Sequence, residues 1–242
     1  QELERYRLNL EERLLNAQED SFARKHAAKS DDVLDEVETY LQYVLEDKEP
    51  EELELYDRPA FLEWVIWRYF LILNSIKMPI KETRGFPIDE DLLPRHTAPG
   101  GVPDMVFEFE DYILVTEVTL TTSQTQINRE AEPVRRHVAN FANEEDKQVY
   151  GLFLAPSIEP NVANEFKEGQ WFDNNNNENP VDIVPLTLEQ FKSLKSVLRI
   201  KNYRPDTFKN LLVYCLAERN KKLQVWLEKI DSHIEKHVAQ WS

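Results

Sequence analysis

Two acidic residues, Asp104 and Glu117, lie where residue type and spacing could support chemistry. Runs rich in Val, Ile, Phe and Thr predict strands over residues 104–110 and 112–120. If this hairpin turns between Glu110 and Asp111, Asp104 faces Glu117 across the ladder. Opposed like charges destabilise a sheet, so the pair needs either a shared proton or a hard divalent cation. We favour the cation, although a one-residue slip in register would move Glu117 to the other face.

Further polar residues surround this pair in the predicted arrangement. Glu63 offers a third carboxylate on the preceding helix, and Thr119 follows Glu117 on the same face of the strand. Helical spacing over residues 123–143 predicts that Gln126, Glu130 and His137 share one polar side of the helix. Glu132 is a competing choice to Glu130. His96 is interpreted as a loop residue. His233 and His237 are four apart on a terminal helix but lack further metal ligands nearby in sequence.

The elements that must position these residues alternate between helices and strands. Helical patterns cover residues 2–46, 59–76, 123–143 with a kink at Pro133, and 188–241. Further strands are expected at 149–154 and 181–186, and loops at 81–103 and 173–180. The order strand, helix, strand predicts a crossover unit. We therefore expect an α/β fold with a central mixed β-sheet flanked by helices, an acidic helical N-terminal segment at 1–58 and a catalytic domain with C-terminal helices at 59–242.

Composition and charge limit the classes of function. The 242 residues carry a formal net charge of −16 and one cysteine. A single cysteine excludes an internal disulfide and fits a cytoplasmic protein, and no apolar stretch is long enough to predict a membrane span. Residues 1–58 hold 18 acidic and 8 basic side chains, whereas residues 191–222 hold 9 basic and 2 acidic ones. The basic run is either a solvated helical face or a phosphate-facing surface.

One run of the sequence resembles the active-site signature of the PD-(D/E)xK nuclease superfamily: GGVPDMVFEFEDYILVTEVTL, which contains Pro103-Asp104 and Glu117-Val118-Thr119. It is most similar to the cleavage domains of the AlwI and BstNBI group of type IIS restriction and nicking endonucleases, in which EVTL replaces the usual ExK. The resemblance continues through Arg129-Glu130 and Arg135-Arg136-His137. It implies a restriction-endonuclease-like core.

The resemblance also implies roles for individual residues. Asp104, Glu117 and the Val118 carbonyl would bind Mg²⁺, for which Mn²⁺ could substitute. Glu63 would match an acidic residue on the preceding helix. Because Thr119 stands where the motif has lysine, Glu130 or His137 would supply the missing function. DNA phosphates would contact several basic residues: Arg129, Arg135, Arg136, Lys201 and Arg204.

The leading hypothesis is a metal-dependent DNA endonuclease domain of a prokaryotic cell. Its overall acidity predicts weak intrinsic affinity for DNA, so that a separate recognition domain, expected in the same longer chain, would supply the target. Cleavage of both strands would require a partner subunit or a transient dimer. The alternatives are a repair or recombination nuclease with the same fold, and a non-catalytic acidic helical interaction module.

Overall fold

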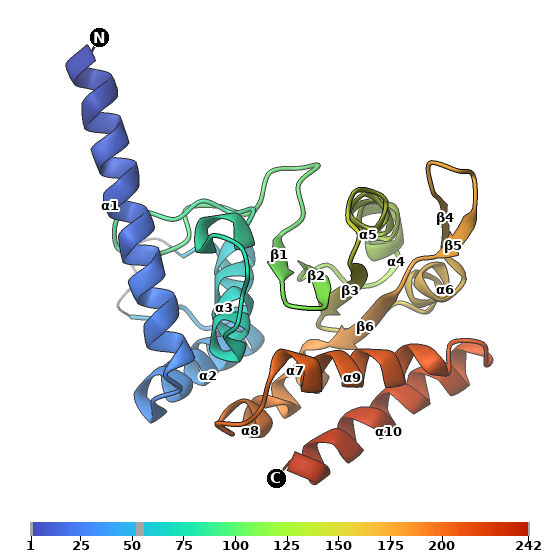
Figure 1. Ribbon diagram of the computed structural model, residues 1–242. Helices are drawn as coiled ribbons and strands as arrows, with labels where there is room; N and C mark the ends of the chain where they lie inside the picture. Colours follow the sequence, from blue (N-terminus) through green and yellow to red (C-terminus); the bar gives the residue numbers. More distant parts are fainter. Residues whose placement is uncertain (1, 52–55, 242) are drawn as a thin grey trace.

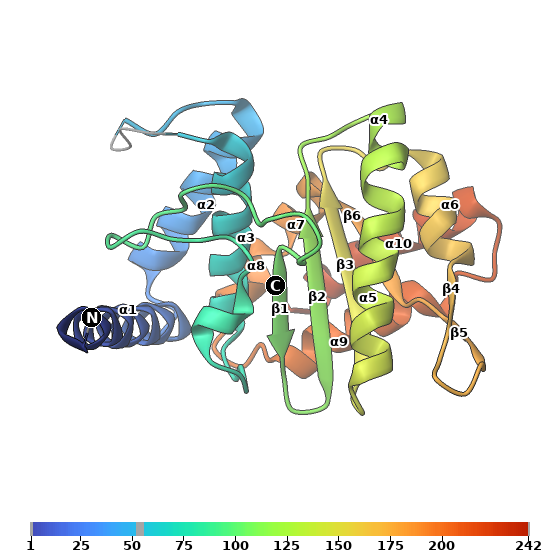
Figure 2. The ribbon, with the colours of Figure 1, turned by 90° about the horizontal axis from the view of Figure 1, so that it is seen from above.

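A four-stranded mixed sheet forms the centre of the computed structural model, which describes residues 2–51 and 56–241 (Figures 1 and 2). Its strands stand in the order β1-β2-β3-β6. The hairpin strand β1 is antiparallel to β2, while β2, β3 and β6 run parallel. The bounds of the strands are β1 Met105–Glu108, β2 Tyr112–Val118, β3 Gln148–Ala155 and β6 Ile183–Thr187. The predicted mixed sheet is thus confirmed, with each strand within two residues of its expected ends.

The register of the β1–β2 hairpin is the one predicted from the sequence. Met105 pairs with Thr116 and Glu108 with Ile113, and the Phe109 N–H donates to the Tyr112 carbonyl across a tight turn at 2.9 Å. Every residue of β2 is buried, as expected for a strand covered on both faces. Alternation along β2 directs Ile113, Val115 and Glu117 to one face of the sheet and the residues between them to the other.

Helices cover the two faces of this sheet (Figures 1 and 2). On the face of Ile113 and Val115 lie α5 Glu132–Glu144 and α6 Pro160–Glu168, with side chains such as Val134, Val138 and Phe166 in a shared core. The other face is covered by α7 Leu188–Ser193, α8 Lys195–Leu198, α9 Pro205–Ala217 and α10 Leu223–Trp241. Helix α5 connects β2 to the parallel β3, which confirms the predicted crossover unit.

The N-terminal helices pack beside the β1 edge of the sheet (Figure 2). They are α1 Glu2–Ala27, α2 Asp31–Glu46 and α3 Arg58–Leu73. Helix α3 is buried along nearly its whole length, because α1, α2 and β1 all contact it. Helix α3 begins at Arg58, and side chains of α2 and α3 enter the same core as those of β1 and α9, so the division expected at residue 58 stays a prediction.

Several local predictions differ from the structure. The helical segment expected over 2–46 consists of two helices separated by residues 28–30, where Lys29 has a φ of 52°, and this break lets both α1 and α2 pack on α3. The loop expected at 173–180 contains part of a small hairpin, β4 Gln170–Phe172 and β5 Glu178–Pro180. Its turn is held by Asp173, which accepts the N–H groups of Asn175 and Asn177. The helix expected at 123–143 begins as α4 Gln124–Gln126 and a π-helical turn, Ile127–Ala131, before α5.

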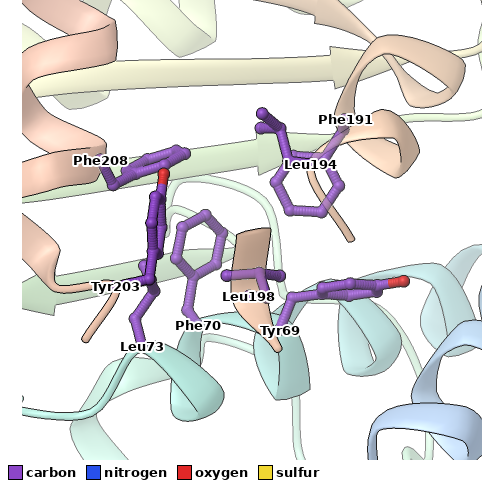
Figure 3. Close-up of a pocket in the computed structure, with 8 residues that line it drawn as sticks. All are labelled: Tyr69, Phe70, Leu73, Phe191, Leu194, Leu198, Tyr203 and Phe208. Carbon is purple, nitrogen blue, oxygen red and sulfur yellow. The ribbon is translucent and has the colours of Figure 1, made fainter. Parts of the chain in front are cut away.

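The seam between α3 and the C-terminal helices holds a small apolar gap. Figure 3 shows Phe70, Leu194 and Phe208 converging on it, and the cavity measures about 10 Å³. That is room for no more than one water molecule, so this gap is part of the core. No helix among the described residues is both long and apolar enough to cross a membrane.

Candidate active site

Asp104 and Glu117 lie side by side at the end of the β1–β2 hairpin. Asp104 directly precedes β1 and continues its register opposite Glu117. The Asp104 N–H lies 3.4 Å from Glu117 Oε2, and the Val118 N–H donates to Asp104 Oδ2 at 2.8 Å. The two carboxylates therefore share the sheet face that α5 covers, as the strand register predicted.

Burial makes this pair of carboxylates costly to ionise. Glu117 is only 8% exposed, and burial raises its pKa to about 8, with a further contribution from Glu130. The pKa of Asp104 is raised well above its ordinary value, first by burial and then by the charge of Glu117. A pair in this state favours protonation, and a bound cation would favour the ionised form instead.

Glu63 brings a third carboxylate to the cluster from α3. It is 4% exposed, and its Oε2 accepts the main-chain N–H of Ala98 at 2.9 Å. Burial raises the pKa of Glu63 to about 9, and the nearby charge of Asp104 adds to the shift. The sequence placed Glu63 on this helix, whereas the contact with Ala98 had no sequence signal because a main-chain N–H is present at almost every position.

His137 reaches Glu117 from α5. Its Nδ1 lies 2.6 Å from Glu117 Oε1, in a single hydrogen bond between the two side chains. His137 is 6% exposed, and its Nε2 has no hydrogen-bond partner within residues 2–51 and 56–241. Burial and then the charge of Arg136 lower its pKa, so the imidazole is neutral at pH 7. His137 therefore orients Glu117 through one ring nitrogen and keeps the other free.

Glu130 occupies the position next to Thr119, the residue that stands where the motif has lysine. The Thr119 hydroxyl donates to Glu130 Oε1 at 3.0 Å and accepts the N–H of Thr121. Glu130 belongs to the π-helical turn Ile127–Ala131, a feature that is frequent at functional sites. The competing residue, Glu132, is exposed and pairs with Arg136. Glu130 is thus the carboxylate that faces the site.

Gln126 does not join this cluster, contrary to the sequence-based expectation. It is fully buried and donates to the carbonyls of Thr121 and Ser157. Its own carbonyl accepts the N–H of Glu159. The prediction assumed uninterrupted α-helical spacing, which the π-helical turn after Gln126 disrupts.

The predicted phosphate-contacting residues fall into two groups. Arg129 and Arg136 are exposed and lie on the same helical segment as Glu130 and His137. Arg135 instead pairs with Glu165 of α6. Lys201 and Arg204 line a pocket with Asn74 at the C-terminal end of α3, about 15 Å along the helix from Glu63. Of the predicted phosphate contacts, Arg129 and Arg136 are thus the exposed ones on the segment that brings Glu130 and His137 to the site.

The basic run at 191–222 is partly neutralised within the chain. Arg199 contacts Asp31, Asp35 and Glu38 of α2, and Lys195 contacts Glu38. These pairs lie between the acidic N-terminal segment and the C-terminal helices. Much of the predicted basic surface is accordingly a contact between helices of the same chain.

The donor set fits a hard cation, although its side chains are not grouped as a complete coordination sphere. Within the described part of the chain, no three His, Cys, Asp or Glu side chains are arranged to hold one metal ion together. Asp104 and Glu117 offer oxygen atoms, the ligands that Mg²⁺ prefers, and Mg²⁺ commonly keeps several water ligands. Elsewhere, His237 is hydrogen-bonded to Tyr203 and His233 stacks on Tyr214. Among the residues that the structure describes, these two histidines thus have no third ligand.

Comparison with known proteins agrees with this geometry. A solved structure described as the small subunit (R.BspD6I2) of the heterodimeric restriction endonuclease R.BspD6I has a TM-score of 0.64 and 25% sequence identity, covering 86% of this chain and 98% of that one. No curated protein matches the sequence. The family model of the AlwI restriction endonuclease matches residues 1–194. The mixed sheet, its flanking helices and this match, which covers most of the sequence, show that the chain belongs to the AlwI restriction endonuclease family.

Proposed function

We propose that this protein hydrolyses DNA phosphodiesters in a reaction that requires Mg²⁺, with Mn²⁺ as a substitute, and that each active site cuts one strand. The observation that carries the proposal is the buried pair Asp104 and Glu117, whose carboxylates share one sheet face. Two buried acids with raised pKa values cost the fold stability, and such groups cluster at functional sites. Membership of a restriction endonuclease family supports DNA as the substrate.

In this proposal, Asp104, Glu117 and the Val118 carbonyl would hold the metal ion. When bound, it would supply Lewis-acid activation of water and stabilisation of the charge that develops on the phosphate. Glu63 holds the loop before β1 through the Ala98 N–H, and it becomes available as a further acidic group when that contact opens.

The residues around the ion orient one another. His137 fixes the rotamer of Glu117, and Thr119 fixes Glu130 beside the pair. Thr119 stands where the motif has lysine, and Glu130 lies beside it. Glu130 is therefore our candidate to accept a proton from the attacking water. His137 Nε2 is the second candidate for that role, because it is neutral and has no partner among the described residues.

The partners that we propose follow from the net charge of the chain and from the structurally similar restriction endonuclease subunit. A chain with a net charge of −16 binds DNA weakly by itself, so a recognition module would raise the effective concentration of the target. The structurally similar protein is the small subunit of a heterodimeric enzyme. By analogy, we propose that a second subunit supplies the other active site when both strands are cut, as in a type IIS enzyme.

Nicking of supercoiled plasmid tests this function. We expect cleavage with Mg²⁺ or Mn²⁺ and none with EDTA. Asp104→Asn and Glu117→Gln should each reduce the rate by roughly 100-fold or more, because each removes a charged metal ligand. Glu144→Gln is the matched control, since Glu144 is an exposed acid at the far end of α5.

The same assay is run with the chain fused to a sequence-specific DNA-binding module. Absence of cleavage in both forms with either metal would refute the proposed function. Undiminished cleavage by both Asp104→Asn and Glu117→Gln would refute the proposed site.

A further inference from the structure

The loop between η1 Ile80–Thr83 and β1 is attached to the carboxylate cluster itself. The Gly85 N–H donates to the Asp104 carbonyl at 2.8 Å, and the Ala98 N–H donates to Glu63 at 2.9 Å. Between these points, Trp64 Nε1 donates to the Leu92 carbonyl at 2.8 Å. A side chain at Gly85 would meet the Pro103 carbonyl, because an added Cβ would lie 2.3 Å from it. Residues 84–103, here called the site loop, are therefore bonded to Asp104 at Gly85, to Glu63 at Ala98 and to Trp64 of α3 between these two points.

The site loop also has an ordered interior. Asp89 Oδ1 accepts the N–H groups of Asp91 and Leu93. Ile88 forms an isolated bridge with Pro94, and the Arg95 N–H donates to the Pro87 carbonyl at 3.0 Å. These contacts fix the main chain at Arg95. The main chain at Arg95 is thus held in place by hydrogen bonds within the loop.

The Arg95 side chain itself is unengaged. It is exposed, and it makes no ion pair or side-chain hydrogen bond within the part of the chain that the structure describes. Several other arginines of this acidic protein form ion pairs with nearby acids, as Arg84 does with Glu19 and Arg199 with Asp35. A fully charged guanidinium close to a carboxylate cluster is available for an anion outside the chain.

Covalent geometry keeps the main chain at Arg95 near Glu63. Arg95 is three positions before Ala98, so their Cα atoms lie at most about 11 Å apart, and Ala98 contacts Glu63 directly. Arg95 thus lies between two contacts of the site loop with neighbouring residues of α3, Leu92 with Trp64 and Ala98 with Glu63. The rise per nucleotide along a DNA strand is roughly 3.4 Å, so an arginine on this loop is suited to a phosphate a few nucleotides from one bound at the carboxylate cluster.

We propose that Arg95 binds a backbone phosphate of the DNA strand beside the phosphate that is cleaved. This inference rests on the proposed nuclease function. An acidic cluster repels DNA, and a pair of arginines flanking it, Arg95 from the site loop and Arg129 from the π-helical turn, offsets that repulsion locally. Arginine suits this role because its planar fork matches the geometry of a phosphate. Arg95 contacts phosphate alone, so it positions the strand and reads no base.

Cleavage kinetics over a series of NaCl concentrations test the proposal. Arg95→Ala should raise KM roughly tenfold with little change in kcat, and should lower the salt slope of kcat/KM by about 1. Arg95→Lys should keep the slope and recover part of the KM. Lys221→Ala is the matched control, because Lys221 is an exposed cation at the α9–α10 turn, on the far side of the sheet from the site loop (Figure 1).

Anisotropy of a labelled DNA duplex in Mg²⁺ provides a second readout that does not depend on cleavage. A lower salt slope of Kd for Arg95→Ala than for wild type would support the phosphate contact even if the chain does not cleave DNA, which separates this inference from the nuclease function. A slope and a KM or Kd equal to those of wild type would overturn it. So would equal changes in Arg95→Ala and Lys221→Ala.

Discussion

At the residue scale, the relation between Asp104 and Glu117 could be predicted because a strand repeats every two residues and a tight hairpin leaves few registers open. The structure has that register. The positions of Gln126 and Ala98 could not be predicted in the same way. Gln126 depends on a π-helical turn, and Ala98 acts through its main chain. Side-chain spacing carries information about a site only while the underlying helix or strand is regular.

His137 gives a prediction at this scale. Because its contact with Glu117 orients a proposed metal ligand, His137→Gln should raise the Mg²⁺ concentration needed for half-maximal nicking by roughly 10-fold or more. A merely structural role would lower the amount of folded protein without moving that concentration. A Mg²⁺ titration of nicking, with the folded fraction checked by thermal unfolding, measures both.

Thr119→Val is the companion to this variant. It removes the hydroxyl that holds Glu130 but leaves both proposed metal ligands in place. We expect a lower kcat and an unchanged Mg²⁺ requirement. A shift in the Mg²⁺ requirement equal to that of His137→Gln would contradict the separate roles assigned to these two residues.

At the element scale, one buried arginine joins the three N-terminal helices. Arg68 of α3 is 1% exposed, and it donates to His26 of α1 at 2.9 Å and pairs with Glu36 of α2 at 2.8 Å. The His26 Nδ1–H donates to the Phe22 carbonyl at 2.8 Å. This arrangement requires a neutral imidazole, since Nε2 must accept from Arg68. Helical periodicity predicted that the N-terminal segment is helical but could not show that its polar residues meet inside the molecule.

The His26 contact predicts a pH-dependent stability. Burial, and then the charges of Arg68 and Lys25, lower the pKa of His26 to about 3, whereas an unfolded histidine titrates near 6.5. The unfolded chain therefore takes up the proton first as the pH falls, so stability is lost from about pH 6.5 downward. Lowering the pH from 7 to 5 should therefore reduce the free energy of unfolding by roughly 2 kcal/mol through His26.

Urea unfolding of wild type and His26→Gln between pH 5 and pH 7 measures this cost. The glutamine variant keeps a hydrogen-bonding side chain but does not titrate. We expect its stability to fall less steeply with acid than that of wild type. If the free energy of unfolding changed with pH equally in the two proteins, His26 would be ruled out as the source of the pH dependence.

At the scale of the whole molecule, acidic side chains of the N-terminal segment form ion pairs with basic side chains of the C-terminal run. Composition showed an acidic segment at one end and a basic run near the other, but whether the basic run faces solvent, phosphate or protein depends on which helices meet. The structure brings α2 against α8, so that Asp31, Asp35 and Glu38 surround Arg199. This contact explains how a segment with many basic residues can belong to a stable acidic domain.

The Arg199 network predicts a salt-dependent contribution to stability. Arg199 and Glu38 are partly exposed, so solvent screening limits the gain, and Arg199→Met should cost roughly 1 kcal/mol in 50 mM NaCl. The cost should fall by about half or more in 1 M NaCl, where screening acts over roughly 3 Å. Lys201→Met is the matched control, because Lys201 is an exposed cation two positions away that forms no ion pair with the described residues. Urea unfolding at both salt concentrations distinguishes the network from simple packing by the arginine stem, since a packing loss would be the same in both.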